Sequence, residues 1–325
     1  MIEQQIILIA SIAGFATFAV SFGLARFLAA KFKEMGITGV DVHKRERPVT
    51  AEMGGLATLL GVGVGAAVIY ALDQQIPFVF LAGVITVLLV GVIGVLDDLV
   101  TLRQRYKPFL VAAVSTPLVI ALFGKSEILF PLIGHIPFGL LYPLLIVPLG
   151  ITTSSNLSNM LAGFNGLEAG CASIGIGALT LLSALKGSES GTIVGALFLA
   201  GYLGFLLLNW YPAKIFPGDT GTLMAGAAIA TIGLISGIEF AAVVVSLPAA
   251  FDFTLKMLNK NPFSARKIHG DTVVEEDGTL HPPDYPALSH AFMRLAPLSE
   301  KSLVQSILLM EAVYAVLAIV LTLVI

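Results

Sequence analysis

The sequence predicts an all-α polytopic membrane protein with about ten transmembrane helices. Of its 325 residues, 57% are hydrophobic and only 12% are charged, which is about half the charge of a typical soluble domain. The apolar residues stand in long blocks, and most blocks are long enough to cross a bilayer core of about 30 Å. Because lipid offers the backbone no hydrogen-bond partners, these blocks are expected to be helices.

Ten apolar blocks follow one another along the chain and give the expected spans. The first is too long for a cleavable signal peptide and lacks a basic leading region, so we expect a retained helix. The fourth and fifth are the shortest, and the count depends on them. We expect residues 1–325 to form one integral membrane domain whose only sizeable polar segment is the 259–302 loop. The blocks are 4–30, 53–72, 77–96, 108–123, 139–153, 166–186, 190–208, 220–236, 238–258 and 303–325.

Basic residues are concentrated in alternate loops between these blocks. Fifteen lysines and arginines follow the first, third, seventh and ninth blocks, whereas the opposite loops hold only Lys125 and Lys186. The positive-inside rule therefore places the basic loops in the cytoplasm and both termini outside. We expect a multi-pass protein of the cell membrane.

Polar residues at the edges of the apolar blocks all emerge on this predicted cytoplasmic side. Asp97 and Asp98 end the third block, Asn156 and Asn159 lie between the fifth and sixth, and Asp219 precedes the eighth. Charge at the membrane edge is costly, so each residue is a candidate for function. Carboxylates, amides and lysines that converge on one face suit a magnesium–phosphate site, because Mg²⁺ prefers oxygen ligands.

Each of these candidates also has a purely structural interpretation. Asp97 and Asp98 could pair with a nearby arginine, although adjacent carboxylates repel each other unless a cation is close. Asn156 and Asn159 could cap or link helices. Asp219 could be the N-cap of the eighth helix.

The basic candidates and the acids near the first loop have similar alternatives. Lys107 could serve only as a positive-inside anchor. The basic turn that contains Arg266, Lys267 and His269 could be solvated and attracted to anionic headgroups. Asp41 and Glu52 could serve only to balance the charge of the basic residues around them.

Five stretches follow one another along the chain: GVDVHKRERPVTAEMGGL, GVLDDLVTLRQRYK, SNLSNMLAGFNGLEAG, NWYPAKIFPGDTGTLMAG and the basic 259–302 loop. In this order they resemble the polyprenyl-phosphate N-acetylhexosamine-1-phosphate transferase superfamily. LAGFNGLEAG and NWYPAKIFPGDT are similar to the dolichyl-phosphate GlcNAc-1-phosphotransferases of the eukaryotic and archaeal branch. The last loop carries ARKIHG where the bacterial branch has a run of histidines.

The resemblance implies a reaction with a cytoplasmic active site. A sugar-1-phosphate, most readily GlcNAc-1-phosphate, would pass from a UDP-sugar to a polyprenyl or dolichyl phosphate, giving lipid-diphosphate-sugar and UMP. This is the first membrane step of a glycan pathway such as N-glycosylation. The implied cofactor is Mg²⁺, with Mn²⁺ as an alternative. The expected partners are the donor, the lipid acceptor and the membrane, without nucleic acid, and a homodimer is left open.

The resemblance also assigns roles to individual residues. Asn159 and Asp219 match the metal ligands, and Asp97, Asp98 and Lys107 match the acidic pair and the lysine at the reacting phosphates. Asn165 resembles a uracil contact, and the basic turn resembles the residues that hold pyrophosphate and the N-acetyl group, although its spacing leaves their individual roles open. The implied substrate-binding residues are Glu52, Asn156, Asn165, Arg266, Lys267 and His269.

The main alternative class is a secondary transporter with one-sided polar sites. A transporter would be expected to carry its polar residues at mid-span and to show an inverted repeat. Here the polar clusters lie at one face and no such repeat is evident. A CDP-alcohol phosphotransferase would need a helical series of aspartates four residues apart, which the sequence lacks.

Overall fold

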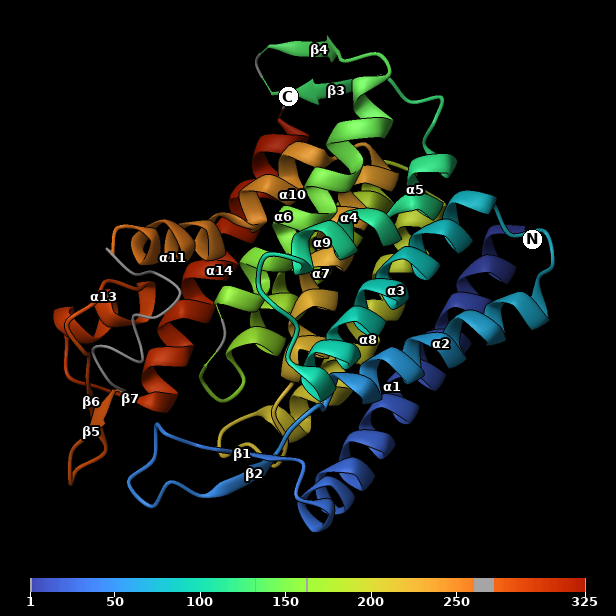
Figure 1. Cartoon of the computed structure of the whole chain (residues 1–325). Helices are drawn as coiled ribbons and strands as arrows, with labels where there is room; N and C mark the ends of the chain where they lie inside the picture. The colour runs from blue at the N-terminus through green and yellow to red at the C-terminus, as the bar shows by residue number, and fades with distance from the viewer. Residues whose placement is uncertain (1, 132, 162, 260–271, 325) are drawn as a thin grey trace.

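Long helices dominate the structure, a computed structural model that describes residues 2–131, 133–161, 163–259 and 272–324 (Figure 1). Among these residues, seven helices are long and apolar enough to cross a membrane, and a bent pair brings the number to eight. The predicted all-α membrane fold is confirmed. The seven are α1 (Ile2–Met35), α2 (Gly55–Leu72), α3 (Phe78–Val100), α7 (Leu167–Leu185), α8 (Glu189–Asn209), α9 (Gly218–Ser236) and α14 (Glu300–Leu323).

The predicted count of ten is approximate because three of the expected spans are broken. Proline stands in the first turn of the second part in each, where its missing N–H is tolerated but the preceding helix must end or bend. The bent pair α10–α11 turns by 55°. The broken spans are α4 (Lys107–Val114) with α5 (Thr116–Ala121), the π-helix η1 (Tyr142–Ile146) with α6 (Val147–Met160), and α10 (Glu239–Val245) with α11 (Leu247–Met257).

Short antiparallel strands lie at the two ends of the helical bundle. The β3–β4 hairpin lies at the end where both termini are found, and the β1–β2 hairpin lies at the opposite end (Figure 1). A three-stranded sheet, β5-β6-β7, lies next to the short helix α13 (Leu288–Leu295). The strands are β1 (Thr38–Val40), β2 (Val49–Ala51), β3 (Glu127–Phe130), β4 (Gly134–Pro137), β5 (Val273–Val274), β6 (Thr279–His281) and β7 (Leu298–Ser299).

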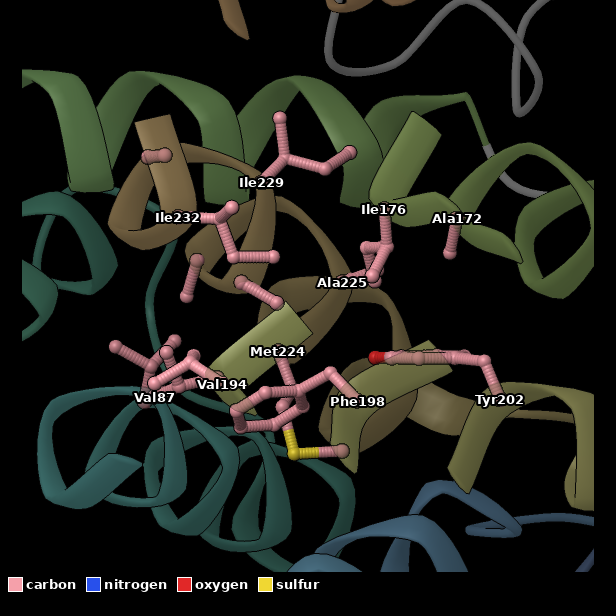
Figure 2. Close-up of a cluster of buried hydrophobic side chains, with 14 of the residues drawn as sticks. Val87, Ala172, Ile176, Val194, Phe198, Tyr202, Met224, Ala225, Ile229 and Ile232 are labelled. Atoms are coloured by element: carbon pink, nitrogen blue, oxygen red, sulfur yellow. The ribbon is translucent and has the colours of Figure 1, made fainter. Parts of the chain in front are cut away.

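Helix α9 forms the centre of the bundle and contacts α2, α3, α6, α7 and α8. Figure 2 shows its side chains Met224 and Ile229 among buried residues of the neighbouring helices, such as Val87 of α3, Ile176 of α7 and Phe198 of α8. The first half of α9 is rich in glycine, alanine and threonine. Small residues let helices approach closely in lipid, where packing replaces the hydrophobic effect.

Two glycines bring the backbones of α2 and α3 against the first turn of α9. A Cβ atom on Gly55 would lie 2.1 Å from the Gly221 nitrogen, and one on Gly94 would lie 2.4 Å from Thr220 Cα. The Gly55 nitrogen also donates a hydrogen bond to the Pro217 carbonyl, at 2.8 Å. Because the opposing atoms are backbone, they cannot turn aside as a side chain can, and α2 and α3 therefore fix the start of α9.

Candidate active site

Four polar side chains from four helices meet at one cluster. Lys107, the first residue of α4, forms an ion pair with Asp97 of α3 and another with Asp219 of α9, at 2.9 Å. Asn159 of α6 donates from Nδ2 to Asp219 Oδ1, at 2.8 Å. Asp97 and Lys107 are buried, and the Asp219 side chain is 30% exposed. The structure thus brings together three of the predicted catalytic and metal-binding residues around one lysine.

Asp98 has different partners from its neighbour. Its Oδ1 accepts a hydrogen bond from the backbone nitrogen of Asp219, at 2.7 Å. Its Oδ2 accepts from the backbone nitrogen and the hydroxyl of Thr220, at 3.1 and 2.6 Å. The N–H groups of a first helical turn have no partners within their own helix. Asp98 therefore caps α9 from the neighbouring α3, and it is a positioning residue for Asp219.

Glu52 lies between β2 and α2, beside this cluster. Its side chain is half-buried. Burial raises the pKa of Glu52, and the negative charges of Asp98 and Asp219 raise this pKa further. Three carboxylates that repel one another make this region suited to a positively charged ligand.

A cavity of about 920 Å³ opens beside the cluster, and Lys107 and Asn159 line it. Asn156 also lines it, with Nδ2 bonded to the Thr152 carbonyl at 2.7 Å. This volume lies within the range of small-molecule sites, about 300–1,000 Å³. Other walls come from the β1–β2 loop, the loop after α6, α11, the loop before α13 and α13 itself, through residues that include His43, Phe164, Phe253, Lys256, Tyr285 and His290.

Asn165 lies outside the lining of this cavity and is only 2% exposed. Its Oδ1 accepts hydrogen bonds from Lys44 Nζ at 2.9 Å and from the Ala213 nitrogen at 2.6 Å. Its Nδ2 donates to Asp41 Oδ2 at 3.0 Å, and its backbone nitrogen donates to Glu300 Oε1 at 2.9 Å. Asn165 thereby joins the segment after α6 to the β1–β2 loop, to the start of α14 and to the loop before α9.

The partners of Asn165 include Glu300, a functional candidate that the sequence did not reveal, and Asp41, whose role the sequence left open. Asp41, His43 and Glu300 place potential metal-binding atoms within 4.8 Å of one another. The Lys44 ammonium already pairs with both Asp41 and Glu300, and so supplies the positive charge there. His43 stacks on Phe164 with ring centroids 4.0 Å apart, and both rings line the cavity. In the sequence, Glu300 is an ordinary acidic residue of the first turn of a helix. Only the fold shows that it pairs with Lys44 and accepts a hydrogen bond from Asn165.

The predicted residues Arg266, Lys267 and His269 lie in 260–271, outside the described residues, and their roles stay predictions. The described residues on both sides of that segment, Lys256 and Thr272, line the cavity.

Known proteins resemble this chain over nearly its whole length. Residues 80–237 match glycosyl transferase family 4. A protein of Methanocaldococcus jannaschii that is named as a glycosyltransferase is 34% identical, over 94% of this chain and 95% of its own. The chain belongs to glycosyl transferase family 4. A Saccharolobus solfataricus relative, named as a UDP-N-acetylglucosamine–dolichyl-phosphate N-acetylglucosaminephosphotransferase, is 31% identical over 94% of each chain.

The family 4 match contains the whole polar cluster. It runs from before Asp97 to beyond Asp219, whereas Glu52, Asp41 and Glu300 lie outside it. A phospho-N-acetylmuramoyl-pentapeptide-transferase of Shouchella clausii is 33% identical over only 60% of this chain and 64% of its own. The superfamily indicated by the five sequence motifs is therefore confirmed.

In this family 4 protein, replacing Asn165 by alanine is expected to lower the free energy of unfolding by about 3 kcal/mol, because it leaves buried charged partners without their amide. Asn156→Ala removes one bond within a helix, and its effect should stay below about 1 kcal/mol. Thermal unfolding of both purified variants measures the difference. If Asn165→Ala loses activity while keeping wild-type stability, the residue is a substrate contact and not a structural link.

Proposed function

We propose that this protein transfers GlcNAc-1-phosphate from UDP-GlcNAc to a polyprenyl or dolichyl phosphate, giving lipid-diphosphate-GlcNAc and UMP. The observation that carries the proposal is the cluster of Asp97, Lys107, Asn159 and Asp219, which reaches the 920 Å³ cavity through Lys107 and Asn159. The names of relatives from Saccharolobus solfataricus and Sulfolobus acidocaldarius, each 31% identical to this chain, support this donor and acceptor. We further propose that the product enters a glycan pathway such as protein N-glycosylation.

The proposal includes Mg²⁺, with Mn²⁺ as an alternative, because the donor atoms of the cluster suit a hard divalent cation. Asp219 offers carboxylate oxygens, and Asn159 carries an amide oxygen. Hard cations prefer such oxygens to nitrogen or sulfur. Asn159 now directs its amide nitrogen to Asp219, and a half-turn of the amide would direct its oxygen there. When bound, the ion would offset negative charge on the diphosphate.

In the proposed reaction, an oxygen of the lipid phosphate forms a bond to the β-phosphorus of the donor. The bond from this phosphorus to the oxygen of the α-phosphate breaks, and UMP leaves with that oxygen. A phosphate monoester has a second pKa near 6, so the attacking group is largely dianionic at neutral pH and needs no general base. The main task of the protein is then to hold two anions together and to neutralise their charge.

Each residue of the cluster has a place in this task. Lys107 lines the cavity and can contact a phosphate group there. Asp97 pairs with Lys107 through Oδ2 and accepts a hydrogen bond from the Leu102 nitrogen through Oδ1, at 2.6 Å. Both of its oxygens are thus used, which favours an orienting role for Asp97 over that of a base. Asp98 holds the start of α9 and so positions Asp219.

We place this site on the cytoplasmic side of a cell membrane, with both termini outside. The basic residues of the β1–β2 loop support this orientation through the positive-inside rule. Both termini lie at the other end of the bundle, which agrees with it (Figure 1).

The proposed function is tested by UMP release from UDP-GlcNAc, with polyprenyl phosphate and Mg²⁺ supplied to the purified protein. UMP should form only when donor, lipid and metal ion are all present, and Asp219→Ala should abolish it. Asp73→Ala, in the short loop after α2, is the matched control and should keep wild-type activity. If another UDP-sugar reacts instead, the donor assignment is wrong. If no UDP-sugar reacts, the enzyme assignment fails, and solute uptake by liposomes tests the transporter.

A further inference from the structure

Glu311 lies at the middle of α14, far along the chain from the cluster described above. It is only 3% exposed. No hydrogen bond or ion pair joins it to any residue within the described part of the chain. A buried carboxyl group is costly unless it is neutralised, paired or hydrogen-bonded, and ionisable residues inside a membrane are functional candidates by default. Glu311 is therefore either a neutral acid or the partner of a group outside these residues.

A small cavity of about 30 Å³ lies directly beside Glu311. Ser154 and Ser158 of α6 line it, as does Ser246 at the break between α10 and α11. None of these hydroxyls is hydrogen-bonded to Glu311 within the described structure, so the polar groups line a shared gap without joining one another. A gap of this volume admits one small particle, such as a water molecule or a dehydrated monovalent cation.

The break between α10 and α11 adds a hydroxyl group to the lining of this cavity. Pro248 has no N–H and interrupts the helix there, and Val245 and Ser246 just before it line the cavity. The Ser246 hydroxyl donates to the Ala242 carbonyl at 2.9 Å, which leaves its lone pairs available as acceptors.

We propose that this cavity binds a monovalent cation, Na⁺, with the Glu311 carboxylate as its charged ligand and serine hydroxyls as neutral ligands. The charge of the surroundings favours a cation over a neutral molecule, because no lysine, arginine or histidine is among the described residues that line the cavity. Cys171, the other titratable residue of the lining, is uncharged as a thiol. The cation would thus supply the positive charge that a buried carboxylate requires.

The proposed cation site adjoins the larger cavity. Leu157 lines both cavities, and α6 carries Ser154 and Ser158 as well as the candidate active-site residues Asn156 and Asn159. A bound cation would therefore link α14 to the helix that supplies the amide of the polar cluster. The existence of this site does not depend on the reaction proposed above, and its test needs no substrate.

Thermal unfolding in detergent at about pH 9 tests this proposal, because Glu311 must be ionised to bind a cation. Choline chloride in the buffer is replaced by NaCl at constant ionic strength. The apparent unfolding temperature of the wild type should rise by about 5 °C as Na⁺ saturates the site. Glu311→Gln, which keeps the shape of the side chain but not its charge, should show no response. The matched control Glu127→Gln, at an exposed acid of β3, should respond as the wild type does.

A second variant keeps the carboxylate and weakens the neutral ligands. Ser154→Ala should raise by about 10-fold the Na⁺ concentration that gives half of the rise in unfolding temperature. This variant tests the proposal if Glu311→Gln does not fold. Three results would overturn the proposal. They are an absent Na⁺ response in the wild type, an equal response in Glu311→Gln, and an infrared band of a protonated carboxylic acid that Glu311→Gln removes. The last would mean that Glu311 is neutral and lies beside water.

Discussion

Replacing Lys107 by methionine is expected to lower the rate of UMP release by about 10³-fold and the free energy of unfolding by about 3–5 kcal/mol. The stability loss follows because Asp97 and Asp219 would lose the shared cation that pairs with both, and an unpaired buried charge is costly. The loss of rate follows because a preorganised positive group near the reacting phosphates would be missing. Single-turnover UMP release and thermal unfolding measure the two effects.

Two further variants separate the charge of Lys107 from its position. Lys107→Arg keeps the positive charge and should retain most of the stability, but its broader head group should still reduce the rate. Lys31→Met breaks an exposed ion pair with Glu34, and pairs of that kind contribute less than about 1 kcal/mol. If Lys107→Met were as stable and as active as Lys31→Met, neither role assigned to Lys107 would hold.

The second large effect is expected from a single methyl group at the start of α2. In Gly55→Ala, the new Cβ would meet the Gly221 nitrogen at 2.1 Å, so the first turn of α9 must move. That turn carries Asp219 and the N–H groups that Asp98 caps. A displacement of about 1 Å at a reacting group can cost about 10²-fold in rate, and overpacking typically costs about 1–3 kcal/mol in stability.

Gly63→Ala, on the same helix, is the matched control. An added Cβ there meets no atom within 4 Å, and alanine has a better helix propensity than glycine by about 1 kcal/mol. The control should therefore be at least as stable as the wild type and fully active. Equal activities of Gly55→Ala and Gly63→Ala would show that the close contact between α2 and α9 does not position the site.

Hydrophobic patterning predicted the membrane fold well, because uninterrupted apolar blocks leave few alternatives to helices. The number of spans was harder to predict, since Pro117, Pro148 and Pro248 break helices whose composition alone indicates continuous ones. Hydrophobic patterning shows how apolar a segment is. It does not show whether a neighbouring helix can accommodate a bend in that segment.

The separate roles of Asp97 and Asp98 show what the sequence could not resolve at the site. Both were expected as an acidic pair, yet adjacent residues of a helix point about 100° apart. Asp97 therefore reaches Lys107, whereas Asp98 reaches the backbone of α9. Asn165 was expected at the nucleotide because of its motif, and its burial among charged partners depends on contacts with Asp41 and Glu300 that only the fold creates.

The cap that Asp98 provides has a consequence for how the protein is made. Asp97 meets Lys107 one loop later in the chain, but the N–H groups that satisfy Asp98 are synthesised 121 residues after it. During sequential insertion, the third helix must wait with an unsatisfied carboxylate at its end until the ninth arrives. A nascent chain that stops before α9 thus lacks the cap of Asp98, and insertion of α9 supplies this cap and Asp219 of the polar cluster in one event.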